Sequence, residues 1–260
     1  MEDLRYLELI KNFIKRKMGI DLSAYRESYL LRRVKIRMAK TRSHTLSSYY
    51  NLLLKEEKES QNLIDTIGIN VSVFFRDRDV FETIKNTILP YFKNRDFIKI
   101  WSAGCAQGEE AYTLSILFLD QGFENFKIFA TDFDSEIIEM AKNGIFEGEK
   151  LEDFPFYLRI KYIEKINNKF KVKDFVKKHI EFKIHDLLSS PFDNDFDIIL
   201  CRNVLIYMQK DAQRKVFENL TSSLKKDGIL ILGKVEMIHP DFENFYLPLN
   251  IKEKIFKKII

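Results

Sequence analysis

Two adjacent carboxylates follow a pair of glycines near the middle of the chain, and their types and spacing indicate a ligand site. Gly104 and Gly108 bracket a tight turn after an apolar strand, and Glu109 and Glu110 come directly after it, where a helix is expected to begin. Small residues let a ligand lie against bare backbone. A helix start that binds phosphate would not carry two carboxylates, because its dipole and free N–H groups favour an anion. The pattern therefore favours S-adenosylmethionine, with its sulfonium, ammonium and ribose groups, over NAD or ATP.

The same residues also have an ordinary structural explanation. Acidic residues are common in the first turn of a helix because they complement the helix dipole. Two glycines four residues apart are a weak motif on their own. Other segments of the chain must therefore support the ligand site.

Polar residues follow the other predicted strands at the same relative position. They are Asp132 and Asp134 after strand 127–131, Asp186 after strand 182–184, and Arg202 and Asn203 after strand 196–200. Parallel strands end at one edge of a sheet, so these side chains should meet there. An acid after the second strand holds ribose hydroxyls in nucleotide-binding sheets, and Asp132 lies 24 residues after Gly108. Asp186 and the neighbouring apolar Leu187 could contact the adenine amino group and one ring face.

A sheet and its helices are needed to position these residues, and the apolar pattern predicts both. Strands are predicted at 98–101, 127–131, 182–184, 196–200, 229–232 and 251–259, and the pattern allows a short strand at 245–249. Helices are predicted at 79–92, 109–118, 135–143 (capped by Ser135) and 211–225. This alternation is typical of a doubly wound α/β sheet that binds ligands at the carboxyl ends of its strands.

The first 70 residues are predicted to form a separate, all-helical domain. Apolar residues recur at helical spacing, as in Leu4, Leu7, Ile10, Phe13, Ile14 and Met18. A second helix should start at 22–25, and helices at 46–54 and 63–69 complete a small bundle. We therefore expect domains at 1–70 and 71–260, with a small β-hairpin insertion at about 161–180.

Positive charge is concentrated in the second of these helices. Between Arg26 and Arg42 the chain has seven Lys and Arg residues and a single acid, although the net charge of the whole chain is only +4. A solvated helix face is the ordinary explanation. The functional interpretation is a docking surface for an acidic partner, either nucleic acid or an acidic protein helix. The residues expected to contact that partner are Arg32, Arg33, Lys35 and Arg37.

Composition favours a soluble, cytoplasmic protein that uses no metal. The chain is 45% hydrophobic and 32% charged, which fits a globular protein. Its start does not read as a signal peptide, and its longest apolar run, 114–119, is too short to span a bilayer. The two cysteines form no Cys-x-x-Cys motif and the four histidines lack metal-ligand spacing. We expect a cytoplasmic monomer that does not insert into a membrane.

The segment 70–76, Asn-Val-Ser-Val-Phe-Phe-Arg, lies at the expected domain junction and has an unusual composition. Three polar residues, Asn70, Ser72 and Arg76, stand among four apolar ones. Burial of the two phenylalanines between the domains would explain the segment structurally, with Arg76 capping the helix that follows. Its polar residues would otherwise be available to a ligand.

With these segments in place, the chain resembles the CheR family of chemotaxis receptor methyltransferases over nearly its whole length. The resemblance is carried by segments 70–76, 100–113 (Ile-Trp-Ser-Ala-Gly-Cys-Ala-Gln-Gly-Glu-Glu-Ala-Tyr-Thr), 129–134 (Phe-Ala-Thr-Asp-Phe-Asp) and 201–208 (Cys-Arg-Asn-Val-Leu-Ile-Tyr-Met). It implies an N-terminal helical domain joined to a Rossmann-like class I methyltransferase sheet. It also implies transfer of a methyl group from S-adenosylmethionine to glutamate side chains in the cytoplasmic helical domain of chemoreceptors, leaving S-adenosylhomocysteine.

The resemblance also implies which residues line the cofactor site. By matching position they are Asn70, Ser72, Arg76, Glu110, Asp132, Asp186, Leu187, Arg202 and Asn203, with Tyr207 near the methyl group. The turn itself adds Gly104 to the expected cofactor site. Ser72 replaces the family's usual Thr, Ala111 its usual Pro, and Asp186 a frequent Asn. In some members of the family the small β-subdomain binds a receptor's C-terminal peptide. The short, glycine-free insertion argues against that function here.

Arg76 and Tyr207 are the expected catalytic residues. Arg76 would bind the carboxylate of either the cofactor or the substrate, and Tyr207 would orient the attacking oxygen or simply pack. Two other functions could use the same sheet, namely methylation of nucleic acid and cofactor sensing without catalysis. Against the first, the fourth strand ends in Arg-Asn-Val-Leu-Ile-Tyr rather than in Asn/Asp-Pro-Pro-aromatic. Against the second, Arg76 and Tyr207 are both present.

Overall fold

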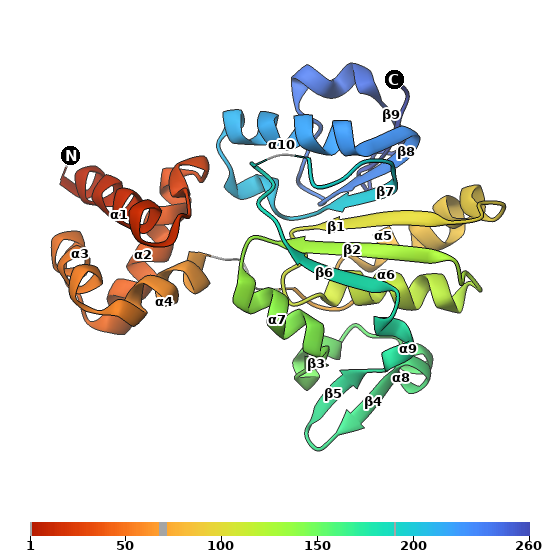
Figure 1. Ribbon diagram of the computed structural model, residues 1–260, viewed down its shortest axis with the longest axis horizontal. Coiled ribbons are helices and arrows are strands. Elements are labelled where there is room, and N and C mark those ends of the chain that lie inside the picture. The colour runs from red at the N-terminus through yellow and green to blue at the C-terminus, as the bar shows by residue number, and fades with distance from the viewer. Residues whose placement is uncertain (1, 68–71, 190) are drawn as a thin grey trace. The chain divides into compact units, whose positions relative to one another are not determined.

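The computed structural model describes residues 2–67, 72–189 and 191–260, which fall into two compact units (Figure 1). The helical unit comprises residues 1–70 and 207–213. The sheet unit comprises residues 71–206 and 214–260. The chain therefore leaves the sheet unit after Ile206 and returns to it at Arg214.

The helical unit is all-helical, as predicted. Its elements are α1 (Glu2–Met18), the 3-10 turn η1 (Leu22–Ala24), α2 (Glu27–Thr41), α3 (Leu46–Lys55) and α4 (Glu57–Ile67). The second helix begins later than expected, because Leu22 starts a short 3-10 turn capped by the Asp21 side chain. Thr45 and Ser48 form a reciprocal capping box at the start of α3. Apolar side chains from all four helices, among them Leu7, Val34, Leu53 and Leu63, form the buried core.

The sheet unit contains a seven-stranded sheet in the order β6-β2-β1-β7-β8-β10-β9. The strands are β1 (Ile98–Ala103), β2 (Phe126–Asp132), β6 (Ile180–Ile184), β7 (Phe196–Cys201), β8 (Leu224–Leu232), β9 (Tyr246–Asn250) and β10 (Ile255–Lys258). Neighbouring strands from β6 to β8 run parallel, and β10 runs antiparallel to both β8 and β9. The predicted Rossmann-like sheet is confirmed, including both strands near the C-terminus.

Helices connect the parallel strands and lie on both faces of the sheet (Figure 1). They are α5 (Arg78–Thr83), which continues through η2 (Ile84–Ile88) and η3 (Leu89–Phe92), then α6 (Glu109–Asp120), α7 (Ser135–Asn143), α8 (Phe156–Tyr162), α9 (Asp174–Lys177) and α10 (Lys210–Ser223), with the 3-10 turns η4 (Gly148–Leu151), η5 (Leu205–Tyr207) and η6 (Pro240–Phe245). The cap of α7 is Asp134 rather than Ser135, because the Asp134 carboxylate accepts from the N–H groups of Glu136 and Ile137. The last helix also ends two residues earlier than predicted, and β8 starts at Leu224.

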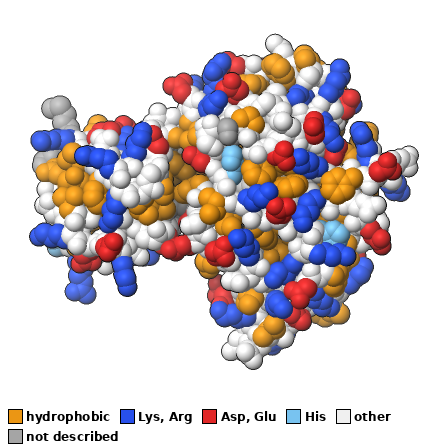
Figure 2. All heavy atoms as spheres, viewed as in Figure 1, with side chains coloured by type: hydrophobic (Ala, Val, Ile, Leu, Met, Phe, Trp, Pro, Cys, Tyr) orange, Lys and Arg blue, Asp and Glu red, His pale blue; other side chains and the backbone are white. Residues whose placement is uncertain are grey.

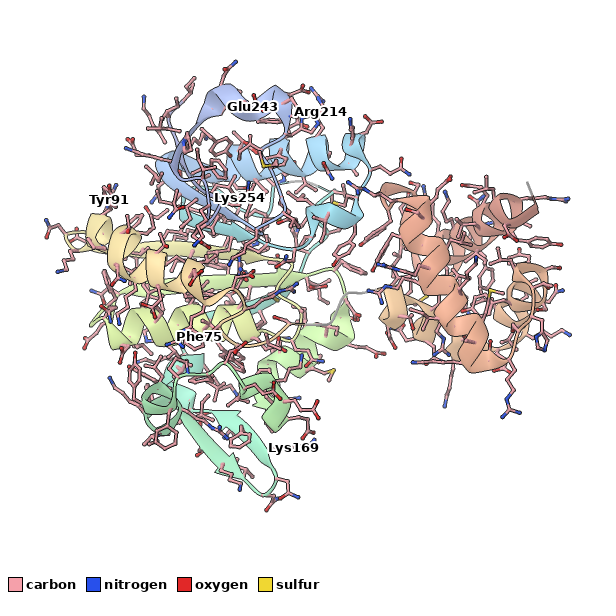
Figure 3. The ribbon with its side chains drawn as sticks, turned by 180° about the vertical axis from the view of Figure 1, so that it is seen from behind. Phe75, Tyr91, Lys169, Arg214, Glu243 and Lys254 are labelled. Carbon is pink, nitrogen blue, oxygen red and sulfur yellow. The ribbon has the colours of Figure 1, made fainter. Side chains whose placement is uncertain are left out.

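The predicted β-hairpin insertion is confirmed as part of a small three-stranded sheet in the order β3-β5-β4. Its strands are β3 (Ile145–Phe146), β4 (Ile163–Ile166) and β5 (Lys169–Val172). Asn167 has a φ of 54° in the turn, and Lys169 begins the returning strand (Figure 3). Because Asn tolerates the left-handed region, the Asn167-Asn168 pair suits a tight turn without glycine.

The register of the parallel strands places their carboxyl ends along one rim. The residue pairs there are Ala103 with Thr131, Asp132 with Ile184, and Cys201 with Leu232. A buried hydrogen bond from Trp101 Nε1 to Thr131 Oγ1, 2.9 Å long, joins β1 to β2 just before that rim. The sheet therefore delivers the polar residues that follow β1, β2, β6 and β7 to one edge.

Candidate functional site

The turn between β1 and α6 needs its glycines for two separate reasons. Gly104 and Gly108 have φ values of 79° and 91°, which L side chains rarely adopt. A Cβ at Gly104 would also lie 2.6 Å from Val204 Cγ2, and one at Gly108 would lie 3.0 Å from the Phe182 ring. The turn is thus held close to the residues that follow β7, with Val204 packed against Gly104.

The two glutamates after this turn have different roles, although they are adjacent in sequence. Glu109 is fully buried, and its Oε1 accepts a 2.7 Å hydrogen bond from Lys150 Nζ. Burial raises the pKa of Glu109, against the charge and hydrogen bond of Lys150, which lower it. Glu110 instead stays partly exposed and accepts a 2.8 Å hydrogen bond from Ser102 Oγ. Only Glu110 therefore faces the rim.

Asp132, at the end of β2, is a second carboxylate at the rim. Its oxygens accept backbone hydrogen bonds from Ala106 at 3.0 Å and from Asp134 at 3.2 Å. Burial raises the pKa of Asp132 to about 6, although these hydrogen bonds oppose the shift. Two carboxylate oxygens offer about four acceptor positions, so Asp132 keeps capacity for ribose hydroxyls.

The segment from Ser72 to Asp77 is fixed against the same turn. Lys150 Nζ donates to Ser72 O at 2.6 Å, and the Phe75 N–H donates to Thr113 Oγ1 at 3.2 Å. Phe75 and Asp77 have positive φ values of 55° and 60°. Asn70, also expected to contact the cofactor, lies outside the described residues.

Arg202 joins three parts of the rim from inside the protein. Its side chain is 2% exposed, and it donates to Glu110 at 3.0 Å and to Asp77 at 2.7 Å. It also donates to the backbone carbonyl of Arg76 at 3.1 Å. The guanidinium thus holds Glu110 and the Arg76 backbone in place, and a contact of Arg202 with the cofactor stays a prediction.

Asp186 and Leu187, which follow β6, make local contacts at the end of that strand. Asp186 is exposed, and its carboxylate accepts from the Leu188 N–H at 2.9 Å in a tight turn. Leu187 is 7% exposed, and its carbonyl accepts from Asn219 Nδ2 at 2.8 Å. These contacts place both residues at the end of β6, beside Asp132 on the neighbouring strand.

The structure reveals a buried carboxylate, Glu236, that sequence reasoning missed. It lies after β8 and accepts hydrogen bonds from the backbone of Asn203 and of the next two residues. Asn203 itself has a φ of 61°. An acid between two apolar residues is the only sequence signal, and it does not identify partners that lie about thirty positions away.

Tyr207 belongs to the helical unit, and its described contacts are there. Its ring centroid lies 4.8 Å from that of Tyr29, and its carbonyl accepts from the Arg26 N–H at 2.9 Å. The Tyr29 hydroxyl donates in turn to the carbonyl of Ile67. Tyr207 thus packs on a tyrosine of the helical unit, and its catalytic role stays a prediction.

The four basic residues expected to dock a partner separate into two groups. Arg32 and Lys35 are exposed, and Lys and Arg side chains are prominent on the helical unit in Figure 2. Arg33 is half-buried and donates to the Tyr29 hydroxyl at 3.2 Å. Arg37 forms an internal ion pair with Glu59 at 2.6 Å, so it is not part of the exposed face.

The rim has the chemistry that S-adenosylmethionine requires. Glu110 and Asp132 are two partly exposed carboxylates that could bind an ammonium group and ribose hydroxyls, and Gly104 adds no side chain beside them. Among the described residues, we find no group of three or more His, Cys, Asp or Glu side chains that could hold a metal ion. In the same part of the chain, each helix is too short or too polar to cross a membrane.

Comparison with known proteins agrees with this chemistry. Residues 70–254 match the model of the CheR methyltransferase S-adenosylmethionine-binding domain, and residues 5–67 match that of the CheR all-alpha domain. A chemotaxis protein methyltransferase of Borreliella burgdorferi is 34% identical over 250 residues, covering 90% of this chain and 87% of its own. One of Listeria innocua is 31% identical over 229 residues, covering 86% and 87%. The chain belongs to the CheR family of S-adenosylmethionine-dependent chemotaxis methyltransferases.

Proposed function

We propose that this enzyme esterifies glutamate side chains on the cytoplasmic helical domain of chemoreceptors, with S-adenosylhomocysteine as the second product. The observation that carries the proposal is the rim itself. Glu110, Asp132 and Asn203 follow three different strands; Arg202 donates to Glu110, Ala106 donates to Asp132, and Glu236 accepts from the Asn203 backbone. Relatives named chemotaxis protein methyltransferases provide the biological setting.

The reaction needs little acid–base chemistry from the protein. A glutamate side chain has a reference pKa of about 4.3, so it is already an anionic nucleophile at neutral pH. S-adenosylmethionine supplies a methyl group on a good leaving group, a sulfonium. The protein's task is to align the carboxylate with that methyl group and exclude water, and orientation can supply roughly 7–11 kcal/mol of barrier reduction.

We assign the residues of the rim to parts of the cofactor by their chemistry. Asp132 accepts hydrogen bonds from the ribose hydroxyls, and Glu110 pairs with the ammonium group of the amino-acid end. Arg76 binds a carboxylate, either that of the cofactor or that of the substrate glutamate. Its carbonyl is held by Arg202, so the backbone at this position is fixed before any ligand binds.

The helical unit provides the docking surface in this proposal. Arg32 and Lys35 are exposed on α2, where they can approach an acidic receptor helix. Such contacts act over a Debye length of about 8–10 Å at physiological salt and guide association more than they strengthen it. The glutamates to be methylated would lie on that same acidic helix.

Transfer of a labelled methyl group tests the proposal and separates it from methylation of nucleic acid. The purified chain is mixed with labelled S-adenosylmethionine and either receptor cytoplasmic fragments or RNA. We expect label on the receptor fragment that is released as methanol by mild base, because a methyl ester hydrolyses whereas an N-methyl group does not. Base-stable label, or label on RNA alone, would contradict glutamate esterification.

A further inference from the structure

Glu236 is a charged residue buried in a loop whose neighbours are exposed. It is 3% exposed, whereas Val235 and Met237 on either side are 73% and 64% exposed. Glutamate is almost never buried without partners. The alternation therefore indicates that the loop after β8 is folded around this carboxylate.

The partners of the carboxylate are four backbone N–H groups from two loops. The hydrogen bonds run to Oε2 from Gly233 at 2.7 Å and from Asn203 at 2.9 Å, and to Oε1 from Leu205 at 2.8 Å and from Val204 at 2.9 Å. Three of these donors follow β7 and one follows β8. The carboxylate thus joins the ends of two neighbouring strands at the rim.

The backbone fits closely around the carboxylate on both sides. A Cβ at Gly233 would lie 2.7 Å from Glu236 Oε2 and 2.8 Å from the Asn203 nitrogen, so only glycine suits this position. Asn203 adopts a positive φ of 61°, which costs free energy unless its surroundings hold it there. The four hydrogen bonds are such a restraint.

The anchored loop also touches the turn proposed to hold the cofactor. Val204, whose N–H donates to Glu236, places its Cγ2 2.6 Å from the position that a Cβ at Gly104 would occupy. The loop after β7 therefore lies against the bare turn after β1. A shift of this loop would move both Asn203 and one wall of the turn.

We propose that Glu236 is a positioning residue for methyl transfer, which acts by fixing the backbone of 203–205 against the cofactor turn. The inference rests on the proposed cofactor site, because it matters only if Asn203 and Gly104 contact the nucleotide. Both carboxylate oxygens of Glu236 accept hydrogen bonds, so a substitute must have two acceptor atoms at these positions. Glutamine keeps the shape but turns a donor NH₂ towards N–H groups that are themselves donors.

Glu236→Gln tests this, with Glu253→Gln as the matched control. Glu253 is another buried glutamate of the sheet unit, 2% exposed; its carboxylate lies 3.4 Å from Lys252 Nζ and 3.9 Å from Lys234 Nζ but accepts no hydrogen bond from the described residues. For Glu236→Gln we expect faster hydrogen exchange of the amides of 203–205 and a Kd for S-adenosylhomocysteine that rises at least about tenfold. We also expect kcat/KM to fall about 100-fold, the size of effect that a 1 Å misplacement can produce. Glu253→Gln should match the wild type in all three.

Gly233→Ala perturbs the same anchor from the other side, and it should reproduce the exchange and affinity changes. The proposal is overturned if Glu236→Gln exchanges and binds like Glu253→Gln, or if its loss of activity only follows the fraction of unfolded protein. The exchange and nucleotide-binding measurements need no receptor. A failure of glutamate esterification would therefore leave the test of Glu236 intact.

Discussion

Arg202 in the sheet unit and Arg32 in the helical unit carry the same guanidinium group in opposite surroundings. Arg202 is 2% exposed and donates to two carboxylates and a backbone carbonyl. Arg32 is exposed, and its described contact is a Tyr29 ring, with the guanidinium carbon 5.8 Å from the ring centroid. The charge of Arg202 thus holds neighbouring groups together, whereas the charge of Arg32 stays exposed to solvent.

The same contrast exists within a single helix. Arg37 lies on α2 with Arg32, but its side chain is 12% exposed and pairs with Glu59, which is 3% exposed. Burial alone would raise the pKa of Glu59, but hydrogen bonds from Arg37, Tyr49 and Asn62 outweigh it and hold the pKa below its usual value. Position on the helix, not residue type, therefore decides which arginine can meet a receptor.

The largest effect is expected at Arg76, the rim arginine whose side chain we assign to a carboxylate. Arg76→Ala should lose nearly all methyl transfer, because substrate or cofactor orientation depends on that pair. The fold should survive, because the backbone carbonyl at this position still accepts from Arg202 in the variant. The measurement is kcat/KM with labelled cofactor, and the exposed neighbour Arg78→Ala is the control. Near-normal activity would remove Arg76 from the site.

Arg202→Ala should instead reduce stability. Removing one partner of a buried ion pair typically costs about 3–5 kcal/mol, because the carboxylates of Glu110 and Asp77 are left uncompensated. Urea unfolding followed by fluorescence reports this directly, since Trp101 is the only tryptophan of the chain and is buried in the sheet unit. An unfolding free energy equal to that of Arg78→Ala would mean that Arg202 does not stabilise the rim.

The raised pKa of Asp132 predicts that both stability and nucleotide binding depend on pH. An acid whose pKa rises from 3.8 to about 6 on folding binds more protons when folded, so its contribution to stability falls as pH rises from about 4 to about 6. Nucleotide binding should follow the opposite trend if ribose hydroxyls need the ionised carboxylate. Below pH 6 the Kd for S-adenosylhomocysteine should rise by up to about tenfold per pH unit.

Calorimetry from pH 5 to pH 7 measures this dependence. Asp132→Asn is the control, because an amide does not titrate and should give a weak but nearly constant affinity. A wild-type Kd that does not change with pH over this range would show that Asp132 is not the ribose ligand, or that it is ionised throughout.

The smallest effects are expected on α2. Arg32→Ala and Lys35→Ala should each weaken receptor binding by about 0.2–1 kcal/mol, the usual range for exposed ion pairs, and added salt should reduce the difference. Neither should change the free energy of unfolding, whereas Arg37→Ala should lower it. Receptor binding that is insensitive to both substitutions and salt would contradict docking through this face.

Much of the site followed from strand order, because parallel strands deliver their ends to one edge. That reasoning predicted Asp132 and Asn203 at this edge without coordinates, whereas Glu110 was singled out only by the resemblance to the CheR family. Strand order could not separate Glu109 from Glu110, since successive helix residues point about 100° apart and the sequence does not show which one faces inward. Lys150, which pairs with Glu109, is 41 positions away.

Arg37 is different, because the sequence held a usable signal. It lies three residues after Val34 and seven after Leu30, both buried, so it continues the apolar stripe of α2 rather than its basic face. Glu236 had no such signal. Its partners are backbone N–H groups, which every residue has, and only the folded loops show which of them converge on it.

A crystal structure of the chain with S-adenosylhomocysteine tests the central claim most directly. We predict the ribose hydroxyls within hydrogen-bonding distance of Asp132, the amino-acid end beside Glu110, and the nucleotide lying against the backbone at Gly104. Nucleotide bound away from the turn after β1 and the end of β2 would contradict the account.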